Sequence, residues 1–263
     1  MVAVDRSDGA RDAVRWAAEV ATAWGTPLRL LHVAAPGASE ARSWLRETAD
    51  LVGSSQVEVA YGPVVDVLAD EGTSARLLVL GSYGAGAVSG MLAGTVALAL
   101  IDRISCPIAV VRGRAPGVPP PCDGPVVVGA DGSVAGSRAL LLAAGLATML
   151  RTDLVVVRTW AEVAAVPHRG VVRRPAGAQS AAADELEVAV AAVAAARPGL
   201  RVEREPVAGT PVRALLERAR TARLLVVGHR GTDPGTGMLH GSTSKALVEF
   251  APCPVVVTGP LAP

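Results

Sequence analysis

The 263-residue sequence is poor in aromatic residues and nearly neutral. Aromatic residues make up 3% of the chain, and 24 acidic residues are interspersed with 25 basic ones, for a net charge of +1. A double-strand nucleic-acid binder needs a basic patch, and a single-strand binder needs aromatic surfaces for stacking. The composition lacks both, so the sequence predicts no nucleic-acid partner.

Cysteine is also scarce. Cys106, Cys122 and Cys253 form an odd set without C-x-x-C spacing, which excludes a disulfide framework and a cysteine-based zinc site. The chain does not start with the charged segment, apolar core and small-residue cleavage site of an export signal. These absences favour a reducing, cytoplasmic location.

Long charge-free runs are confined to one stretch, residues 84–101, which has glycines at a spacing typical of packed membrane helices. The corresponding stretch of the second half contains Asp233, His240 and Lys245. We therefore predict no membrane span. The mean hydropathy of +0.40 instead reflects the Ala, Val and Leu content of two compact cores.

Apolar strand runs alternate with helix-period stretches in both halves, which predicts βαβ units and parallel sheets. Expected strands span 2–5, 28–33, 57–61, 77–81 and 107–111, then 125–130, 154–159, 201–207, 223–228 and 254–258. Expected helices span 9–24, 38–52, 63–73 and 94–104, then 135–150, 179–196, 211–221 and 241–250. The domains expected are residues 1–112 and 125–263, joined by a proline-rich linker at 113–124.

The two halves are a repeat with one insertion. The offset is 126 residues from Asp5 to Asp131 and from Val33 to Thr159, but 147 from Gly62 to Gly209 and from Gly81 to Gly228. The second half therefore has 21 extra residues between its second and third strands. The extra residues centre on 167–180, which is rich in Gly, Pro and Arg. Either a basic flap over a ligand or a solvated irregular loop fits this composition, and we favour the irregular loop.

A glycine motif also occurs twice, each time directly after an apolar strand run. It reads Gly81-x2-Gly84, nine residues, Gly94-Thr95 in the first half, and Gly228-x2-Gly231, nine residues, Gly241-Ser242 in the second. Glycine lets backbone N–H groups approach an anion, and a helix starting at the hydroxyl residue directs its unpaired N–H groups to the same point. Simple turns are the alternative, but identical spacing in two copies favours a phosphate-binding loop.

These residues resemble the universal stress protein family, in a tandem form of its ATP-binding branch. The resemblance covers nearly the whole chain and rests on the double glycine motif, Val4-Asp5, Ala130-Asp131-Gly132-Ser133, Cys106-Pro107 and Cys253-Pro254. It implies an α/β fold with two doubly wound open parallel sheets of five strands each, in the order 3-2-1-4-5, in a tandem Rossmann-like arrangement. It also implies ATP, with or without Mg2+, as the ligand.

That strand order places a topological switch point between strands 1 and 4, where doubly wound sheets bind ligands. Asp5 and Asp131 end the first strands, and we favour a ligand role for them over the alternative of turn or capping carboxylates. The resemblance implies the following nucleotide-binding residues: Val4, Asp5, Val33, Gly81, Tyr83, Gly84, Gly94, Thr95 and Val96, and Ala130, Asp131, Gly132, Ser133, Thr159, Val227, Gly228, Arg230, Gly231, Gly241, Ser242, Thr243 and Ser244.

The two copies are not identical. Ala97 stands where the second half has Ser244, which predicts one phosphate donor fewer in the first half. Arg6 replaces a glycine, and Tyr83 replaces an arginine. Asp233, inside the second loop, either repels phosphate or reaches a bound Mg2+. We expect both sites to bind, the second with more donors.

No catalytic residues are predicted. Neither half has the lysine of a G-x4-G-K-[ST] loop or an evident base that activates water, so efficient hydrolysis is not expected. A regulatory nucleotide-binding module in the stress response is favoured. The alternatives are a slow Mg-dependent ATPase or phosphate-transfer enzyme, and a structural partner protein with vestigial sites. The short apolar last strands predict that the halves pair as an internal pseudo-dimer, with a further homodimer as an option.

Overall fold

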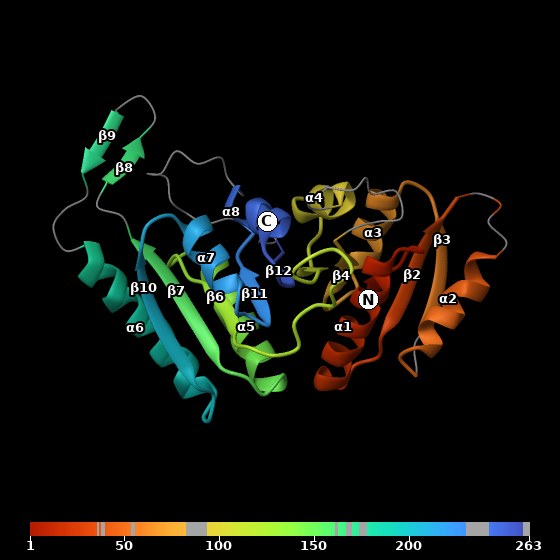
Figure 1. The fold of residues 1–263 in the computed structure, drawn as a ribbon, viewed down its shortest axis with the longest axis horizontal. Helices are drawn as coiled ribbons and strands as arrows, with labels where there is room; N and C mark the ends of the chain where they lie inside the picture. The colour runs from red at the N-terminus through yellow and green to blue at the C-terminus, as the bar shows by residue number, and fades with distance from the viewer. Residues whose placement is uncertain are drawn as a thin grey trace.

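The protein is built from two successive series of strands and helices (Figure 1). The computed structural model describes residues 1–35, 37, 40–53, 56–82, 94–160, 163–166, 170–173, 178–229 and 242–259. The first series contains β1 (Val2–Ala3), α1 (Asp8–Trp24), β2 (Arg29–Ala34), α2 (Ala41–Asp50), β3 (Gln56–Tyr61), α3 (Val64–Gly72), β4 (Leu78–Gly81), α4 (Thr95–Ile101) and β5 (Ile108–Val111). The second contains β6 (Val126–Gly129), α5 (Val134–Met149), β7 (Leu154–Trp160), β8 (Val163–Val166), β9 (Gly170–Arg173), α6 (Ala178–Ala196), β10 (Val202–Ala208), α7 (Pro211–Ala219), β11 (Leu224–Val227), α8 (Ser242–Phe250) and β12 (Val255–Val257).

All strands except the β8–β9 pair belong to one ten-stranded sheet, in the order β10-β7-β6-β11-β12-β5-β4-β1-β2-β3. Each half contributes five parallel strands in the order 3-2-1-4-5, as the family resemblance implies. The prediction of two separate sheets is wrong, because β5 and β12 pair antiparallel, with Ile108 opposite Val257. Both strands are fully buried, so the apolar edge of each half is covered by the other half.

The insertion of the second half forms a hairpin rather than an irregular loop. Strands β8 and β9 pair antiparallel as a separate two-stranded sheet, with Val163 opposite Arg173 and Val166 opposite Gly170. Both segments contain valines, which favour extended strands. The Gly, Pro and Arg residues of the insertion suggested an irregular loop instead. The last residues of the expected loop, 178–180, belong to a helix, because α6 begins at Ala178.

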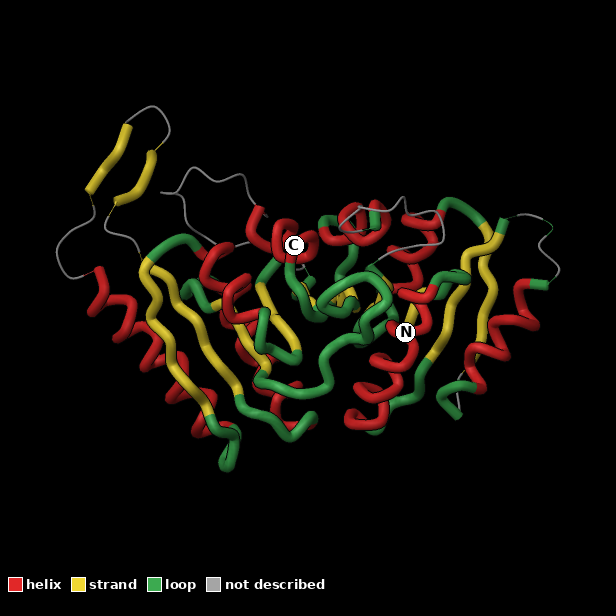
Figure 2. The backbone as a smooth tube through the Cα atoms, in the orientation of Figure 1, coloured by secondary structure: helices red, strands yellow, loops and turns green. Residues whose placement is uncertain are grey.

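Helices cover both faces of the sheet. The core on one face is formed with α1, α2, α5 and α6, and the core on the other with α3, α4, α7 and α8. Strands in the middle of the sheet are therefore buried on both sides, which explains why they appear in the sequence as continuous apolar runs. Figure 2 shows the two layers of helices against the strands. Among the described helices, none combines the length and the apolar character that a membrane span needs.

The helices that follow β1 and β6 start in the same way. The hydroxyl of Ser7 accepts a hydrogen bond from the Ala10 backbone at 3.1 Å, and the hydroxyl of Ser133 accepts one from Gly136 at 2.9 Å. These bonds satisfy N–H groups that lack partners in the first helical turn. Both helices therefore begin directly at the carboxyl ends of the first strands, where the ligand site is predicted.

Candidate functional site

The structure has a cavity of about 120 Å³ at the carboxyl ends of β6, β7 and β11. It lies at the switch point of the second half, where β6 is flanked by β7 on one side and β11 on the other. The lining residues are Gly129, Ala130, Asp131, Gly136, Val157, Arg158, Thr159, Pro211, Leu215, Val227, Gly228 and Thr243. Six of them, Ala130, Asp131, Thr159, Val227, Gly228 and Thr243, are among the predicted nucleotide-binding residues.

The aspartates that end the first strands hold the turns that lead into the helices. Oδ1 of Asp131 accepts hydrogen bonds from the Ser133 backbone N–H at 3.0 Å and from the Ser133 hydroxyl at 2.5 Å. Oδ1 of Asp5 does the same with Ser7, at 3.0 and 2.5 Å. The turn role that sequence reasoning set aside is thus present. The turn uses one carboxylate oxygen of Asp131. The other oxygen makes no hydrogen bond to a described residue, and the Asp131 side chain borders the cavity.

Arg158 is a lining residue that sequence reasoning missed. It belongs to β7, is 20% exposed, and donates from Nη1 to the Ala130 carbonyl at 3.4 Å and from Nη2 to Glu185. Its Nε is buried without a hydrogen-bond partner in the described structure. The signal was a charged residue interrupting an apolar strand run one position before Thr159.

In the first half, His32 takes the place of Arg158. Its Nδ1 lies 2.7 Å from the Val4 carbonyl, which corresponds to the Ala130 carbonyl of the second half. The ring of Trp44 packs edge-on against His32, with centroids 4.8 Å apart, and the Arg6 guanidinium lies 5.5 Å from the Trp44 centroid. The end of β1 is therefore flanked by aromatic rings and a cation, whereas the end of β6 is flanked by an arginine.

Arg6 and Gly132 also differ in backbone conformation. Gly132 has a φ of +78°, in the left-handed region that favours glycine. Among the described residues with a side chain, Arg151 alone has a positive φ, so Arg6 does not follow the backbone path of Gly132. The two turns after the aspartates therefore differ in shape as well as in charge.

The first glycine of each motif packs closely against a helix. A Cβ at Gly81 would lie 2.6 Å from the carbonyl carbon of Gly9, and one at Gly228 would lie 3.0 Å from that of Ala135. Both neighbours belong to the first turn of the helix that follows strand 1 of the same half. Glycine here brings β4 against α1 and β11 against α5, so these two glycines have a packing role besides the phosphate role that is predicted for them.

Helices α4 and α8 start where the glycine motifs end. Thr95 opens α4 after the N-cap Gly94, with Val96 next, and Ser242 opens α8, from which Thr243 reaches the cavity. Val33, at the end of β2, is partly buried against the core.

The third residue of each of these helices faces the protein interior. Ala97 and Ser244 are each 2% exposed, and the Ser244 hydroxyl donates to the His229 carbonyl at 3.3 Å. The expected difference in phosphate donors between Ala97 and Ser244 is therefore not supported. Tyr83, Gly84, Arg230, Gly231 and Gly241 lie outside the described residues.

Cysteine and metal chemistry find no support at this site. Burial raises the pKa of Cys106 above its ordinary value and that of Cys253 to about 12, so both thiols remain protonated at neutral pH. In the described ranges, no group of three His, Cys, Asp or Glu side chains gathers in a way that would hold a metal ion.

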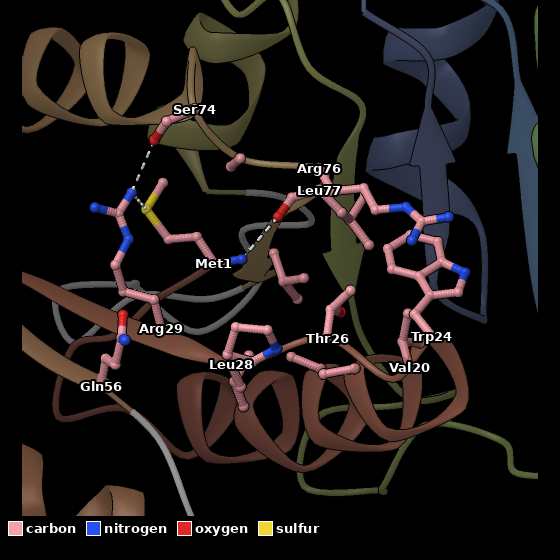
Figure 3. A pocket seen from close by; sticks show the side chains of 15 residues that line it. Met1, Val20, Trp24, Thr26, Leu28, Arg29, Gln56, Ser74, Arg76 and Leu77 are labelled. Atoms are coloured by element: carbon pink, nitrogen blue, oxygen red, sulfur yellow. Dashed lines mark hydrogen bonds between the residues drawn. The ribbon is translucent and has the colours of Figure 1, made fainter.

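A larger cavity, of about 280 Å³, lies at the opposite edge of the sheet, at the amino ends of the first-half strands. Figure 3 shows Arg76 against Trp24, with 4.2 Å between the guanidinium and the ring centroid, and Arg29 on the far side. At the corresponding edge of the second half, the Gly124 carbonyl accepts a hydrogen bond from the Thr152 hydroxyl, just before β7. The Pro125 carbonyl accepts one from the Arg223 backbone, just before β11. Because parallel sheets bind ligands at their carboxyl edge, the smaller cavity is the better candidate.

Comparisons with known proteins match one family along nearly the whole chain. The sequence model of the universal stress protein family matches residues 1–61, 49–112 and 124–259. A universal stress protein of Mycobacterium tuberculosis strain H37Rv is 32% identical over 286 aligned residues, covering 98% of this chain and 95% of the relative. One of Mycolicibacterium smegmatis is 31% identical over 293 residues, covering 99% and 96%.

Among solved structures, a universal stress protein from Archaeoglobus fulgidus DSM 4304 superposes with a TM-score of 0.68 at 20% identity, covering 98% of this chain and 97% of that one. A protein described as a putative universal stress protein, from Pseudomonas aeruginosa, gives a TM-score of 0.64 at 15% identity. These similarities show the same fold over nearly the full length of this chain. The family match and the mycobacterial relatives show that this chain belongs to the universal stress protein family.

Proposed function

We propose that the protein binds adenine nucleotide, ATP in the first instance, at one site per half and acts as a regulatory module of the stress response in the cytoplasm. The observation that carries this proposal is the cavity at the switch point of the second half, where Asp131, Thr159, Gly228 and Thr243 meet. Residues from three strand ends and one helix start converge there, although they are far apart in the sequence.

The chemistry of the lining suits a nucleoside phosphate. The unengaged carboxylate oxygen of Asp131 is an acceptor for ribose hydroxyl groups, as acidic residues are in other doubly wound folds. Val157, Leu215 and Val227 supply apolar surface for a base. The first turn of α8, with Thr243, supplies hydroxyl and backbone N–H donors to phosphate, and the helix dipole favours negative charge there.

The same site offers little for turnover. Its described titratable groups are Asp131, which is tied to Ser133, and Arg158, which is paired with Glu185. Neither is a base placed to activate water, and Mg2+ would be carried by the nucleotide. We therefore propose binding that signals occupancy rather than efficient hydrolysis.

The test starts with the purified full chain, denatured so that any bound nucleotide is released and identified by mass spectrometry. Isothermal titration with ATP, ADP and cyclic AMP, each with and without Mg2+, then gives affinity and stoichiometry. We expect two ATP sites in the wild type. Asp131→Ala should weaken one of them about tenfold or more, because hydrogen bonds to a charged group are worth about 1.5–3 kcal/mol.

Asp153→Ala is the matched control. Asp153 pairs with Arg201 at 3.6 Å, and it lies at the start of β7, on the opposite edge of the sheet from the cavity. It should leave both sites intact. Protein that is isolated empty and shows no heat of binding and no thermal shift with any of the three nucleotides would refute the proposal, whereas ADP production that Asp131→Ala abolishes would favour the slow ATPase instead.

A further inference from the structure

Helix α8 begins at the second-half site and packs against α7 and β12 of its own half, but it also contacts α4 of the first half across the join between β5 and β12. Its first turn carries Thr243 to the cavity. The position of that turn therefore depends in part on what the first half fixes along this nine-residue helix.

Arg112, the residue after β5, holds the carboxyl end of α8. It is 7% exposed, and it donates from Nη2 to the Val248 carbonyl at 2.5 Å and from Nη1 to the Glu249 carbonyl at 2.6 Å. Carbonyls in the last turn of a helix have no partner within the helix, and a cation there is favoured by the helix dipole. The Leu247 carbonyl is bonded by Ala251 at 2.9 Å, so Arg112 serves the two carbonyls that follow it.

Asp102, at the carboxyl end of α4, makes a second connection. Its Oδ2 accepts a hydrogen bond from Lys245 Nζ of α8 at 2.5 Å, and its Oδ1 lies 3.2 Å from His229 Nε2. His229 is 3% exposed, directly follows Gly228, and donates from its backbone N–H to the Thr258 hydroxyl at 3.3 Å. Asp102 of the first half thus contacts both α8 and His229, which directly follows the cavity residue Gly228.

The reverse arrangement is absent at the corresponding positions of the repeat, 147 residues away. Gly259 corresponds to Arg112, and a Cβ there would lie 2.0 Å from the Ser105 carbonyl oxygen, so a side chain does not fit. Leu98 corresponds to Lys245 and Ser82 corresponds to His229, and neither Leu98 nor Ser82 carries a charge. In the described structure the connections run one way, from the first half to the helix of the second.

We propose that Arg112 and Asp102 are positioning residues of the second-half site, so that ligand affinity in the second half depends on the first half. The ligand is the adenine nucleotide of the proposed function, and this inference rests on that function. The positioning of α8 is itself measurable without any ligand.

The first experiment is hydrogen–deuterium exchange on the unliganded full chain, with the α8 peptide and the α4 peptide compared in each variant. Arg112→Gln should raise exchange in α8 about tenfold or more, since it removes two hydrogen bonds from a charged donor, and should leave α4 unchanged. Arg112→Lys should be intermediate, because a lysine retains the charge but does not present the two-donor fork.

Arg103→Gln is the matched control. Arg103 pairs with Asp66 at 2.7 Å, both side chains being about half exposed, and it follows Asp102 in the chain without a bond to α8. Its variant should exchange like the wild type in both peptides. If Arg112→Gln does not fold, Asp102→Asn decides the matter, because the 39% exposed Asp102 tolerates a neutral isostere.

The second experiment separates the two sites by titration with ATP. Arg112→Gln is combined with Asp5→Ala, which leaves the second-half site, and with Asp131→Ala, which leaves the first-half site. We expect about a tenfold loss of affinity in the first combination and none in the second. An equal loss in both combinations, or unchanged exchange in α8, would overturn the inference. If neither background binds ATP, the proposed function fails, and the exchange experiment still decides whether Arg112 positions α8.

Discussion

Replacing the first glycine of each motif with alanine tests whether packing or phosphate binding requires it. At Gly81 the added Cβ would meet backbone atoms of Gly9 at 2.6 and 2.7 Å and of Ala10 at 2.9 Å. At Gly228 the nearest atoms, all of Ala135, are 3.0 to 3.1 Å away. Backbone atoms of a helical turn do not move aside as a side-chain tip does, so α1 must shift further from β4 than α5 from β11.

Overpacking costs about 1–3 kcal/mol. The shorter contacts place Gly81→Ala near 3 kcal/mol and Gly228→Ala near 1 kcal/mol, as order-of-magnitude figures on that scale. With about 2–4 °C per kcal/mol for a chain of this size, the melting temperature should fall by about 6–12 °C and about 2–4 °C, respectively. Differential scanning calorimetry of the unliganded variants measures both shifts without nucleotide.

Gly145→Ala is the control for this comparison. A Cβ at Gly145 would meet Arg197 and Met149 side chains at 3.5 and 3.7 Å, which are ordinary contacts, and alanine there should stabilise α5 by about 0.4–1 kcal/mol. If Gly81→Ala melts within a degree of the wild type, the close approach of α1 to β4 is wrong. Phosphate binding would then be the remaining reason for glycine at that position.

Three further predictions concern single side chains. The Lys245 hydrogen bond, with a smaller contribution from His229, holds the pKa of Asp102 below its ordinary value of 3.8. The stabilisation is therefore present above pH 3.8 and lost as the pH falls through the lower folded-state pKa, so the difference in melting temperature between the wild type and Asp102→Asn should shrink in that range. Ser133→Ala removes the N-cap of α5 and should cost about 1 kcal/mol in a urea titration. Iodoacetamide at pH 8 should label the exposed Cys122 in the native protein but label Cys253 only after unfolding, as peptide mass spectrometry would show.

Much of the fold was predictable because parallel strands buried on both faces leave continuous apolar runs. The run at 224–227 is an example: all four residues are buried, and its expected bounds of 223–228 were one residue too long at each end. The strand order inside each half came from the family resemblance and is confirmed. The hairpin at 163–173 was missed because its flanking Gly, Pro and Arg residues suggest a loop.

The pairing of β5 with β12 was anticipated from two apolar edges, and the same pairing merges the two expected sheets into one. Side-chain contacts between the halves were beyond sequence reasoning. Contacts of Arg112 and Asp102 with α8 depend on how one half is rotated against the other, which no local pattern records. Arg158 was missed for a different reason, since the family resemblance implies a site residue at the next position, Thr159.

The structure gives the expected inequality of the two sites a different basis from the one that the motifs suggest. Identical glycine spacing and a buried Ala97 or Ser244 make the two helix starts more alike than expected. The differences lie instead at the ends of the second strands, with His32 in one half and Arg158 in the other, and in the one-way contacts with α8. Exchanging His32 and Arg158 between the halves should therefore change the ATP affinities of the two sites in a titration, whereas exchanging Ala97 and Ser244 should change the melting temperature and leave both affinities unchanged.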